Sequence, residues 1–247
     1  MNELIDFWRQ LNLEEKPLLH KNDNIKKDDY IDCKDFSDYI KLMKSPKFKS
    51  DNKFHLGLIP IPYIGDIENA KIYILMLNPG FGICDYYGES NNEAFKKSLV
   101  NNLRQVLDKE YPFIFLNPEF LWHGGGQYWE KKLKNIIEET KTLLKYSYAD
   151  ALSHVAKTVA VLQLVPYHSK SYLDIEPESS KIMRNFVENE LLSKSEKCII
   201  CPRGNNHWKL KDNDNIILSP DKKSRAGHIS KNTFSEEKWK KIIDLLQ

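Results

Sequence analysis

The fold of this chain is decided by the stretch Ala70-Lys-Ile-Tyr-Ile-Leu-Met-Leu-Asn78-Pro79-Gly80-Phe81. Residues 72–78 are almost all apolar, and Asn78-Pro79-Gly80 ends the run as a turn. A short apolar run closed by turn residues is typical of a buried strand in a parallel sheet. Open α/β sheets place their binding crevices at the carboxyl ends of such strands, and a glycine there lets a ligand approach the backbone closely. The sequence therefore predicts a pocket whose floor carries one neutral amide, that of Asn78.

Length and composition indicate a globular protein. The chain has 247 residues, of which 41% are hydrophobic and 29% charged, so it can bury a sizeable core in one large domain. No apolar run approaches the roughly 20 residues that a membrane helix needs. The amino terminus lacks the basic and apolar regions of a signal peptide. We therefore expect a cytoplasmic protein.

Charge argues neither for nor against nucleic acid. The net charge is +2, from 37 basic and 35 acidic side chains. A phosphate-binding protein that covers a large duplex surface usually shows a stronger bias, but an enzyme needs only a local basic face. Lysines cluster in residues 41–53 and 209–231, and most of them are expected to be solvated surface.

The cysteines offer one metal-like spacing. Cys198 and Cys201 have the C-x-x-C spacing of a zinc, redox or iron–sulfur site, whereas Cys33 and Cys84 are scattered. The pair falls in an expected strand over residues 197–201, where side chains three positions apart point to opposite faces. We therefore predict no metal ion and no other cofactor.

Apolar runs and helical periodicities alternate along the chain. Strands are expected at residues 72–78, 158–165, 197–201 and 215–219. Helices are expected at about 92–109, 128–144, 148–157, 178–192, 205–210 and 235–246. Strands that alternate with helices predict a three-layer α/β sandwich with a central four-stranded parallel sheet.

Two further features complete the predicted organisation. Helices over residues 2–12 and 36–43, followed by a polar linker, predict a helical N-terminal extension over 1–55, ahead of an α/β domain over 56–247. Loops are expected over residues 81–89 and at His123-Gly-Gly-Gly126, which resembles an oxyanion-hole loop of esterases.

Polar clusters follow three of the expected strands. They are Asn78-Pro79-Gly80, His168-Ser169 and Ser219-Pro220. Because the carboxyl ends of parallel strands share one edge of a sheet, we expect these clusters to converge.

These clusters also carry a family resemblance. Leu77-Asn78-Pro79-Gly80 resembles the first motif of the uracil-DNA glycosylase superfamily, in its mismatch-specific thymine/uracil-DNA glycosylase-like form. Pro62-Tyr63-Ile-Gly65-Asp66 is similar to the lead-in of related bacterial members. Leu162-Gln163-Leu-Val-Pro166 is similar to the second-strand motif, in which an Asn usually reads the base edge. Leu218-Ser219-Pro220, followed by Ser224-Arg225-Ala-Gly-His228, resembles the last motif, whose loop wedges into the minor groove. The resemblance covers about residues 58–232 and implies a uracil-DNA glycosylase-like fold.

Three positions depart from the family pattern. Asn78 stands where the most active uracil-excising members have an Asp, and Gln163 replaces the usual Asn. Ser219-Pro220-Asp221 stands where the last motif often begins His-Pro-Ser or Asn-Pro-Ser. These departures favour a substrate base that is larger than uracil or modified.

The resemblance implies a monofunctional DNA glycosylase that acts without a metal. Such an enzyme flips a base out of DNA and hydrolyses its N-glycosidic bond, leaving an abasic site, in DNA repair or in defence against modified foreign DNA. The implied catalytic residues are Asn78, which orients water, and His168, which stabilises the departing base. The expected substrate-binding residues are Pro79, Gly80, Phe81, Tyr86, Gln163, Ser169 and Ser219, and the expected DNA-binding residues are Lys222, Lys223, Arg225 and His228. The expected partner is DNA, either a duplex with a flipped base or a single strand. The protein is expected to act as a monomer and not to bind a membrane.

Each of these residues also has a purely structural interpretation. Asn78 is favoured in turns, His168 can cap or support the backbone, and Gln163 can be a buried amide that the backbone satisfies. Two other functions stay open, a binding module of the same fold that does not cut DNA and a small-molecule hydrolase. No G-x-S-x-G elbow, G-x-G-x-x-G fingerprint or P-loop is present in the sequence.

Overall fold

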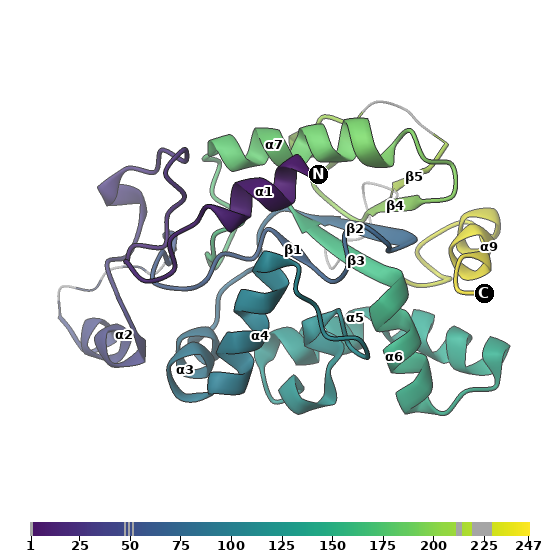
Figure 1. Cartoon of the computed structure of the whole chain (residues 1–247), viewed down its shortest axis with the longest axis horizontal. Coiled ribbons are helices and arrows are strands. Elements are labelled where there is room, and N and C mark those ends of the chain that lie inside the picture. The colour runs from purple at the N-terminus through teal and green to yellow at the C-terminus, as the bar shows by residue number, and fades with distance from the viewer. Residues whose placement is uncertain (1, 47, 49, 51, 211–213, 219–228) are drawn as a thin grey trace. The chain divides into compact units, whose positions relative to one another are not determined.

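The computed structural model describes residues 2–46, 48, 50, 52–210, 214–218 and 229–247, and its chain forms two compact units (Figure 1). The first unit comprises Met1–Pro62, Leu77–Val106 and Gln163–Phe186. The second comprises Tyr63–Met76, Leu107–Leu162 and Val187–Gln247. The predicted extension over residues 1–55 thus belongs to a unit that also contains the segments after the two central strands.

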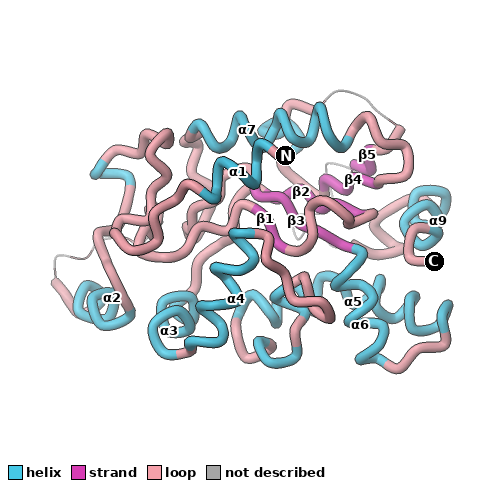
Figure 2. Tube along the Cα trace, in the orientation of Figure 1, coloured by secondary structure: helices cyan, strands magenta, loops and turns pink. Residues whose placement is uncertain are grey.

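Within the described residues the strands form one sheet, drawn in magenta in Figure 2. Its strands, in spatial order, are β1 (Tyr63–Ile64), β3 (Val159–Gln163), β2 (Ile72–Met76), β4 (Cys198–Cys201) and β5 (Ile216–Leu218). β2 pairs with β4 in parallel, β4 pairs with β5 in parallel, and β1 pairs with β3 antiparallel. The predicted mixed α/β class is confirmed.

The sheet differs from the predicted one in its strand number and in one strand direction. The expected strands correspond to β2, β3, β4 and β5, but β1 adds a fifth among the described residues and runs antiparallel. Pro60 and Pro62 have no N–H to donate, so the preceding segment cannot form a full strand. Tyr63 and Ile64 follow them and pair with β3 at its edge, with Tyr63 opposite Leu162.

Burial explains why the central strands read as unbroken apolar runs. Every residue of β2, β3 and β4 is buried. In a strand whose two faces are both covered, as in a parallel sheet covered by helices, polar and apolar residues do not alternate, because neither face meets solvent.

The second unit also contains seven helices within its described residues. They are η2 (Ile114–Leu116), η3 (Pro118–Phe120), α5 (Gly124–Leu144), α6 (Tyr148–Thr158), η4 (Val187–Leu191), α8 (Asn205–Trp208) and α9 (Glu236–Asp244). α5 packs on α6 and η2 and also touches α9. Ser147 begins α6 by accepting the N–H of Asp150, while the Asp150 carboxylate accepts the N–H of Ser147.

The sequence predicts a loop at His123-Gly-Gly-Gly126, and this prediction is wrong, because the glycines form the first turn of α5. His123 caps the helix, with its Nδ1 accepting the N–H of Gly125 at 3.0 Å. A Cβ on Gly125 would lie 2.6 Å from the Phe115 ring, and one on Gly126 would lie 2.5 Å from the Phe120 carbonyl oxygen. The glycines therefore serve close helix packing.

The first unit contains six helices within its described residues. They are α1 (Glu3–Arg9), η1 (Lys27–Asp29), α2 (Phe36–Met43), α3 (Ile83–Asn91), α4 (Glu93–Arg104) and α7 (Glu178–Phe186). α1 packs on α4 and α7, while α3 packs on α2 and α4. The Arg104 guanidinium donates to the carbonyl oxygens of Trp8 at 2.9 Å and Leu11 at 2.7 Å. These bonds tie α4 to the end of α1 and the residues after it, where the Trp8 carbonyl oxygen also accepts the N–H of Leu11 at 3.2 Å.

The loop predicted over residues 81–89 is also wrong, because α3 begins at Ile83. The Asp85 carboxylate accepts the N–H of Gly82 at 2.6 Å, so a negative charge sits at the helix start. The helix predicted to reach residue 109 ends at Arg104, since Gln105 adopts a left-handed φ of 54°. No helix in the described part of the chain has both the length and the apolar character to span a bilayer.

Candidate functional site

The turn after β2 sets the backbone of the candidate site. β2 is fully buried, whereas Leu77, Asn78, Pro79 and Gly80 are each half-buried. Gly80 has a φ of 78°, and a Cβ there would meet nothing within 4 Å, so the conformation rather than the space requires glycine. Asn78 therefore lies just beyond the buried strand, at a position that solvent partly reaches.

Two hydrogen bonds fix the side-chain amide of Asn78. Its Nδ2 donates to the carbonyl oxygen of Ser169 at 2.9 Å and to Ser169 Oγ at 3.0 Å. A backbone carbonyl can only accept, so the NH₂ group must face Ser169 and Oδ1 must point away from it. Among the described residues nothing donates to Oδ1. Asn78 thus presents a fixed, half-buried acceptor.

Ser169 is itself held in place. It is fully buried, and its Oγ donates to the carbonyl oxygen of Ser171 at 2.9 Å, which leaves Oγ lone pairs for Asn78. Ser171 is tied in turn to Asn52, whose Oδ1 accepts from its N–H at 3.2 Å and from its Oγ at 2.7 Å. The amide of Asn78 therefore rests on a chain of oriented hydroxyl groups.

His168 lies beside this turn and supports its backbone. Its side chain is buried, with Nδ1 at 3.0 Å from the Gly80 carbonyl oxygen and Nε2 at 3.2 Å from the Ile59 carbonyl oxygen. Only an imidazolium carries a proton on both nitrogens, so a positively charged ring is the form that satisfies both carbonyls. The carbonyl oxygen of His168 accepts the N–H of His55 at 2.9 Å.

Gln163 ends β3 and is almost completely buried. Its backbone N–H donates to the Pro62 carbonyl oxygen at 2.8 Å. Its side-chain Oε1 is shielded from solvent and has no hydrogen-bond partner among the described residues. A buried acceptor left unpaired costs about 1–3 kcal/mol, which a ligand N–H group would recover.

The expected stacking residues form an aromatic cluster. Phe81 is half-buried and stacks on His55, with ring centroids 3.5 Å apart and an interplanar angle of 12°. Tyr86 is 1% exposed and stacks on Tyr39 at 5.0 Å, and Phe81 meets both tyrosine rings edge to face. Tyr87 is 49% exposed and faces Phe36 instead. Of these rings, Phe81 is the one placed at the Asn78 turn.

The remaining predicted site residues lie outside the described residues. They are Ser219, Lys222, Lys223, Arg225 and His228. The predicted DNA wedge and the third polar cluster therefore stay predictions from the sequence.

Several residues that position the site were missed at the level of sequence. Asn52 and His55 lie within the predicted extension and its linker, and Ser171 follows the His168-Ser169 cluster without any motif. Polar linker residues give no local signal, since their role arises only when distant segments meet. The one local signal is the position of His55 directly before the apolar run that begins at Leu56, where the predicted extension ends.

The two cysteines with metal-like spacing are buried, and their thiols are free. Cys198 and Cys201 are buried free thiols at the two ends of β4, and burial raises the pKa of Cys198 to about 12. No group of three or more His, Cys, Asp or Glu side chains in the described part of the chain is placed to hold a metal ion.

The arrangement offers neutral acceptors and an aromatic ring rather than a carboxylate. Asn78 Oδ1 can accept from water, Gln163 Oε1 can accept from a ligand N–H, and Phe81 presents a ring for stacking. A neutral amide cannot remove a proton from water, so it suits a reaction in which the substrate bond breaks before water attacks.

Comparisons of the chain with protein-family models, with curated proteins and with solved structures found no match.

Proposed function

We propose that this protein is a DNA glycosylase with a fold of the uracil-DNA glycosylase type. It would flip a mismatched or modified base out of DNA and hydrolyse the bond between base and sugar. The resemblance of the Asn-Pro-Gly turn and of the later motifs supports this proposal. The observation that carries it is the fixed orientation of the Asn78 amide, with Oδ1 turned away from Ser169.

The chemistry of N-glycosidic cleavage matches that orientation. Positive charge grows on the sugar and negative charge on the departing base as the bond stretches. Water can then attack an already cationic sugar, so it needs orientation more than deprotonation. Asn78 Oδ1 would accept a hydrogen bond from this water and direct its lone pair toward the sugar, and the proton released as the new C–O bond forms would pass to the departing base anion.

The departing base needs donors, acceptors and a stacking surface. Gln163 Oε1 would accept an N–H group of the base edge, and the Phe81 ring would stack on the base. The imidazolium form of His168 would place a positive charge beside the turn. This charge would stabilise the negative charge that grows on the base.

The proposal is tested with purified protein and duplexes that carry uracil, mismatched thymine or hypermodified cytosines. Abasic sites are revealed by strand cleavage in alkali. We expect excision from one of these duplexes, and the Asn78→Ala variant should excise about 100-fold more slowly. Asn135→Ala is the matched control, because Asn135 is an exposed amide on α5.

Two results would count against the proposal. The first is the absence of abasic sites on every duplex, and the second is equal turnover by the Asn78→Ala and Asn135→Ala proteins. Circular dichroism of both variants establishes that a loss of activity is not a loss of fold.

A module that binds DNA without cutting it is the second candidate. One observation favours it, since both ring nitrogens of His168 already face backbone carbonyl oxygens. A histidine used in this way cannot also donate to a base. Salt-dependent binding of modified duplexes without any abasic product would select this alternative.

A further inference from the structure

The first unit also contains a cavity, whose lining includes Tyr86 of the aromatic cluster but no residue of the Asn78 turn. It has a volume of about 510 Å³, within the range of roughly 300–1,000 Å³ that is typical of small-molecule sites. Its lining includes the aliphatic side chains of Leu13, Leu18, Leu58, Ile59 and Val100 and the rings of Phe36 and Tyr86. Asn78, Gln163 and His168 do not line it.

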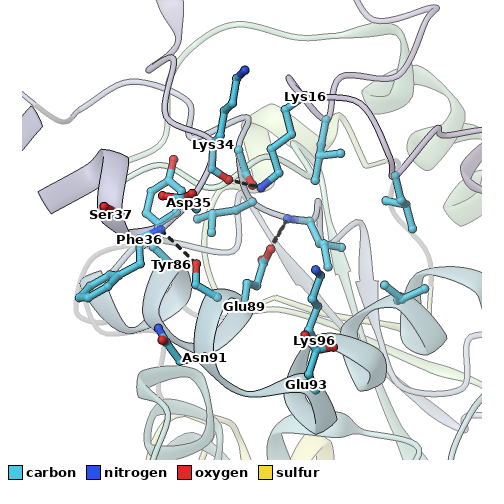
Figure 3. Close-up of a pocket in the computed structure, with 17 residues that line it drawn as sticks. Lys16, Lys34, Asp35, Phe36, Ser37, Tyr86, Glu89, Asn91, Glu93 and Lys96 are labelled. Carbon is cyan, nitrogen blue, oxygen red and sulfur yellow. Dashed lines mark hydrogen bonds between the residues drawn. The ribbon is translucent and has the colours of Figure 1, made fainter. Parts of the chain in front are cut away.

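Three ionisable side chains line this cavity. Figure 3 shows Lys16, Glu89 and Lys96 around the same cavity, with the Lys16 ammonium turned to the Lys34 carbonyl oxygen and the Glu89 carboxyl group turned to the N–H of Ile59. Glu89 belongs to α3 and Lys96 to α4. No ion pair joins either lysine to Glu89 within the described part of the chain. All three residues line the cavity, so a ligand that enters it can reach them.

The ammonium group of Lys16 is fixed in position and has one hydrogen left for a further hydrogen bond. Its Nζ donates to the carbonyl oxygens of Lys34 and Gly57, which fixes the position of the group. An ammonium has three hydrogens, so one remains for a ligand oxygen.

Lys96 adds a second cation from α4. Its ammonium makes neither an ion pair nor a hydrogen bond with any residue that the structure describes. The other two acids on the cavity wall serve helix starts: Asp35 accepts the N–H of Asp38 at 2.9 Å, and Glu93 lies in the first turn of α4.

Glu89 is buried and is compatible with a bound anion. Its two carboxyl oxygens lie 3.0 and 3.2 Å from the N–H of Ile59. Burial raises the pKa of Glu89 to about 8, against the opposing effects of that N–H and of the two lysines. Burial thus favours the neutral carboxyl group, which can donate a hydrogen bond to an anion instead of repelling it.

We propose that this cavity binds a small organic anion, with its phosphate or carboxylate head between Lys16, Lys96 and Glu89 and its apolar body against Leu58, Ile59 and Val100. The site does not depend on the glycosylase proposal, because it shares no residue with the Asn78 turn. A phosphate monoester and a carboxylate present the same anionic oxygens, and a titration distinguishes the two heads.

The test is calorimetric titration of the full chain with four probes. Phenyl phosphate and benzoate carry an anionic head on an apolar ring, benzamide is the neutral analogue, and inorganic phosphate lacks the ring. We expect one of the two aromatic anions to bind, more tightly than benzamide and inorganic phosphate by about tenfold. The tighter of the two anions identifies the head group.

Matched variants locate the site. Lys96→Gln should weaken binding of the preferred anion about tenfold, whereas Lys97→Gln, a neighbouring exposed lysine of α4 outside the cavity, should leave it unchanged. Neither lysine supports the fold, so both variants should unfold at the wild-type temperature. Val100→Ala should weaken the aromatic anion about threefold and leave inorganic phosphate unaffected.

The proposal is overturned by any of three results. These are no binding of either aromatic anion up to about 10 mM, affinities of Lys96→Gln and Lys97→Gln that agree within about threefold, or benzamide or inorganic phosphate bound as tightly as the preferred anion.

Discussion

Asn78 and a catalytic carboxylate differ in what each can do to a water molecule. A carboxylate can take a proton, whereas an amide can only orient the water, so its orientation must be fixed to be useful. Here the fixing comes from Ser169, which accepts both hydrogens of the amide through its carbonyl oxygen and its Oγ. The orientation of the Asn78 amide thus rests in part on the hydroxyl group of Ser169.

Removing that hydroxyl should therefore slow the proposed reaction. In the Ser169→Ala variant the amide keeps one of its two hydrogen bonds and gains rotational freedom. We expect kcat of base excision to fall about tenfold with little change in KM, because water orientation is lost while base binding is not. Ser153→Ala is the control, since it removes a hydroxyl that donates to the Glu110 carbonyl oxygen in the second unit. Equal kcat values for both variants would show that Ser169 does not position the amide.

Glu89 predicts a dependence of stability on pH. Burial raises its pKa to about 8 in the folded chain, from an ordinary value of 4.5. Between these values the folded chain holds a proton that the unfolded chain has lost, so the free energy of unfolding falls as pH rises through this window. Its contribution is fully present below the lower value.

Urea unfolding at about pH 5 and about pH 9 measures the effect in the wild type and in Glu89→Gln. The variant lacks the titrating group, so its stability should fall less over this range. A fall of the same size in both proteins would assign the pH dependence to other groups.

At the scale of elements, the glycines at the start of α5 make opposite predictions. A Cβ on Gly126 would lie 2.5 Å from the Phe120 carbonyl oxygen, whereas one on Gly124 would meet nothing within 4 Å. Gly126→Ala should therefore lower the free energy of unfolding by about 2–3 kcal/mol through backbone overlap. Gly124→Ala should raise it by about 0.5–1 kcal/mol, because alanine loses less backbone entropy. Melting temperatures measure both, and a stable Gly126→Ala protein would contradict the packing role.

The same elements show what sequence patterns can predict. The bounds of α2 were predicted to the residue, and β2, α5 and α6 within a few residues, because apolar periodicity and caps are local signals. The start of α3 was missed because a Gly-containing, aromatic stretch reads as a loop until Asp85 binds the N–H of Gly82. β1 was missed as a strand because two paired residues leave no periodicity.

At the scale of the whole molecule, the polar clusters were predictable and their support was not. Asn78, His168 and Ser169 follow strands, and hydrogen bonds join these two of the three expected clusters. The third, Ser219-Pro220, lies outside the described residues. The residues that hold them, such as Asn52 and His55, come from a segment with no motif. Contacts between segments more than a hundred residues apart leave no pattern in a single sequence.

Asp23 is the clearest case of such long-range support and carries the last prediction. Its buried carboxylate accepts the Tyr167 hydroxyl at 2.5 Å, and the N–H and Oγ of Ser179 at 2.8 Å each. It thus joins the N-terminal segment to the residue before His168 and to α7. Asp23→Ala leaves these buried donors unpaired, so the free energy of unfolding should fall by about 3 kcal/mol. Urea unfolding measures this loss against Asp28→Ala, an exposed carboxylate of η1 whose removal should cost less than about 0.5 kcal/mol. Equal midpoints for the two variants would mean that Asp23 does not hold the first unit together.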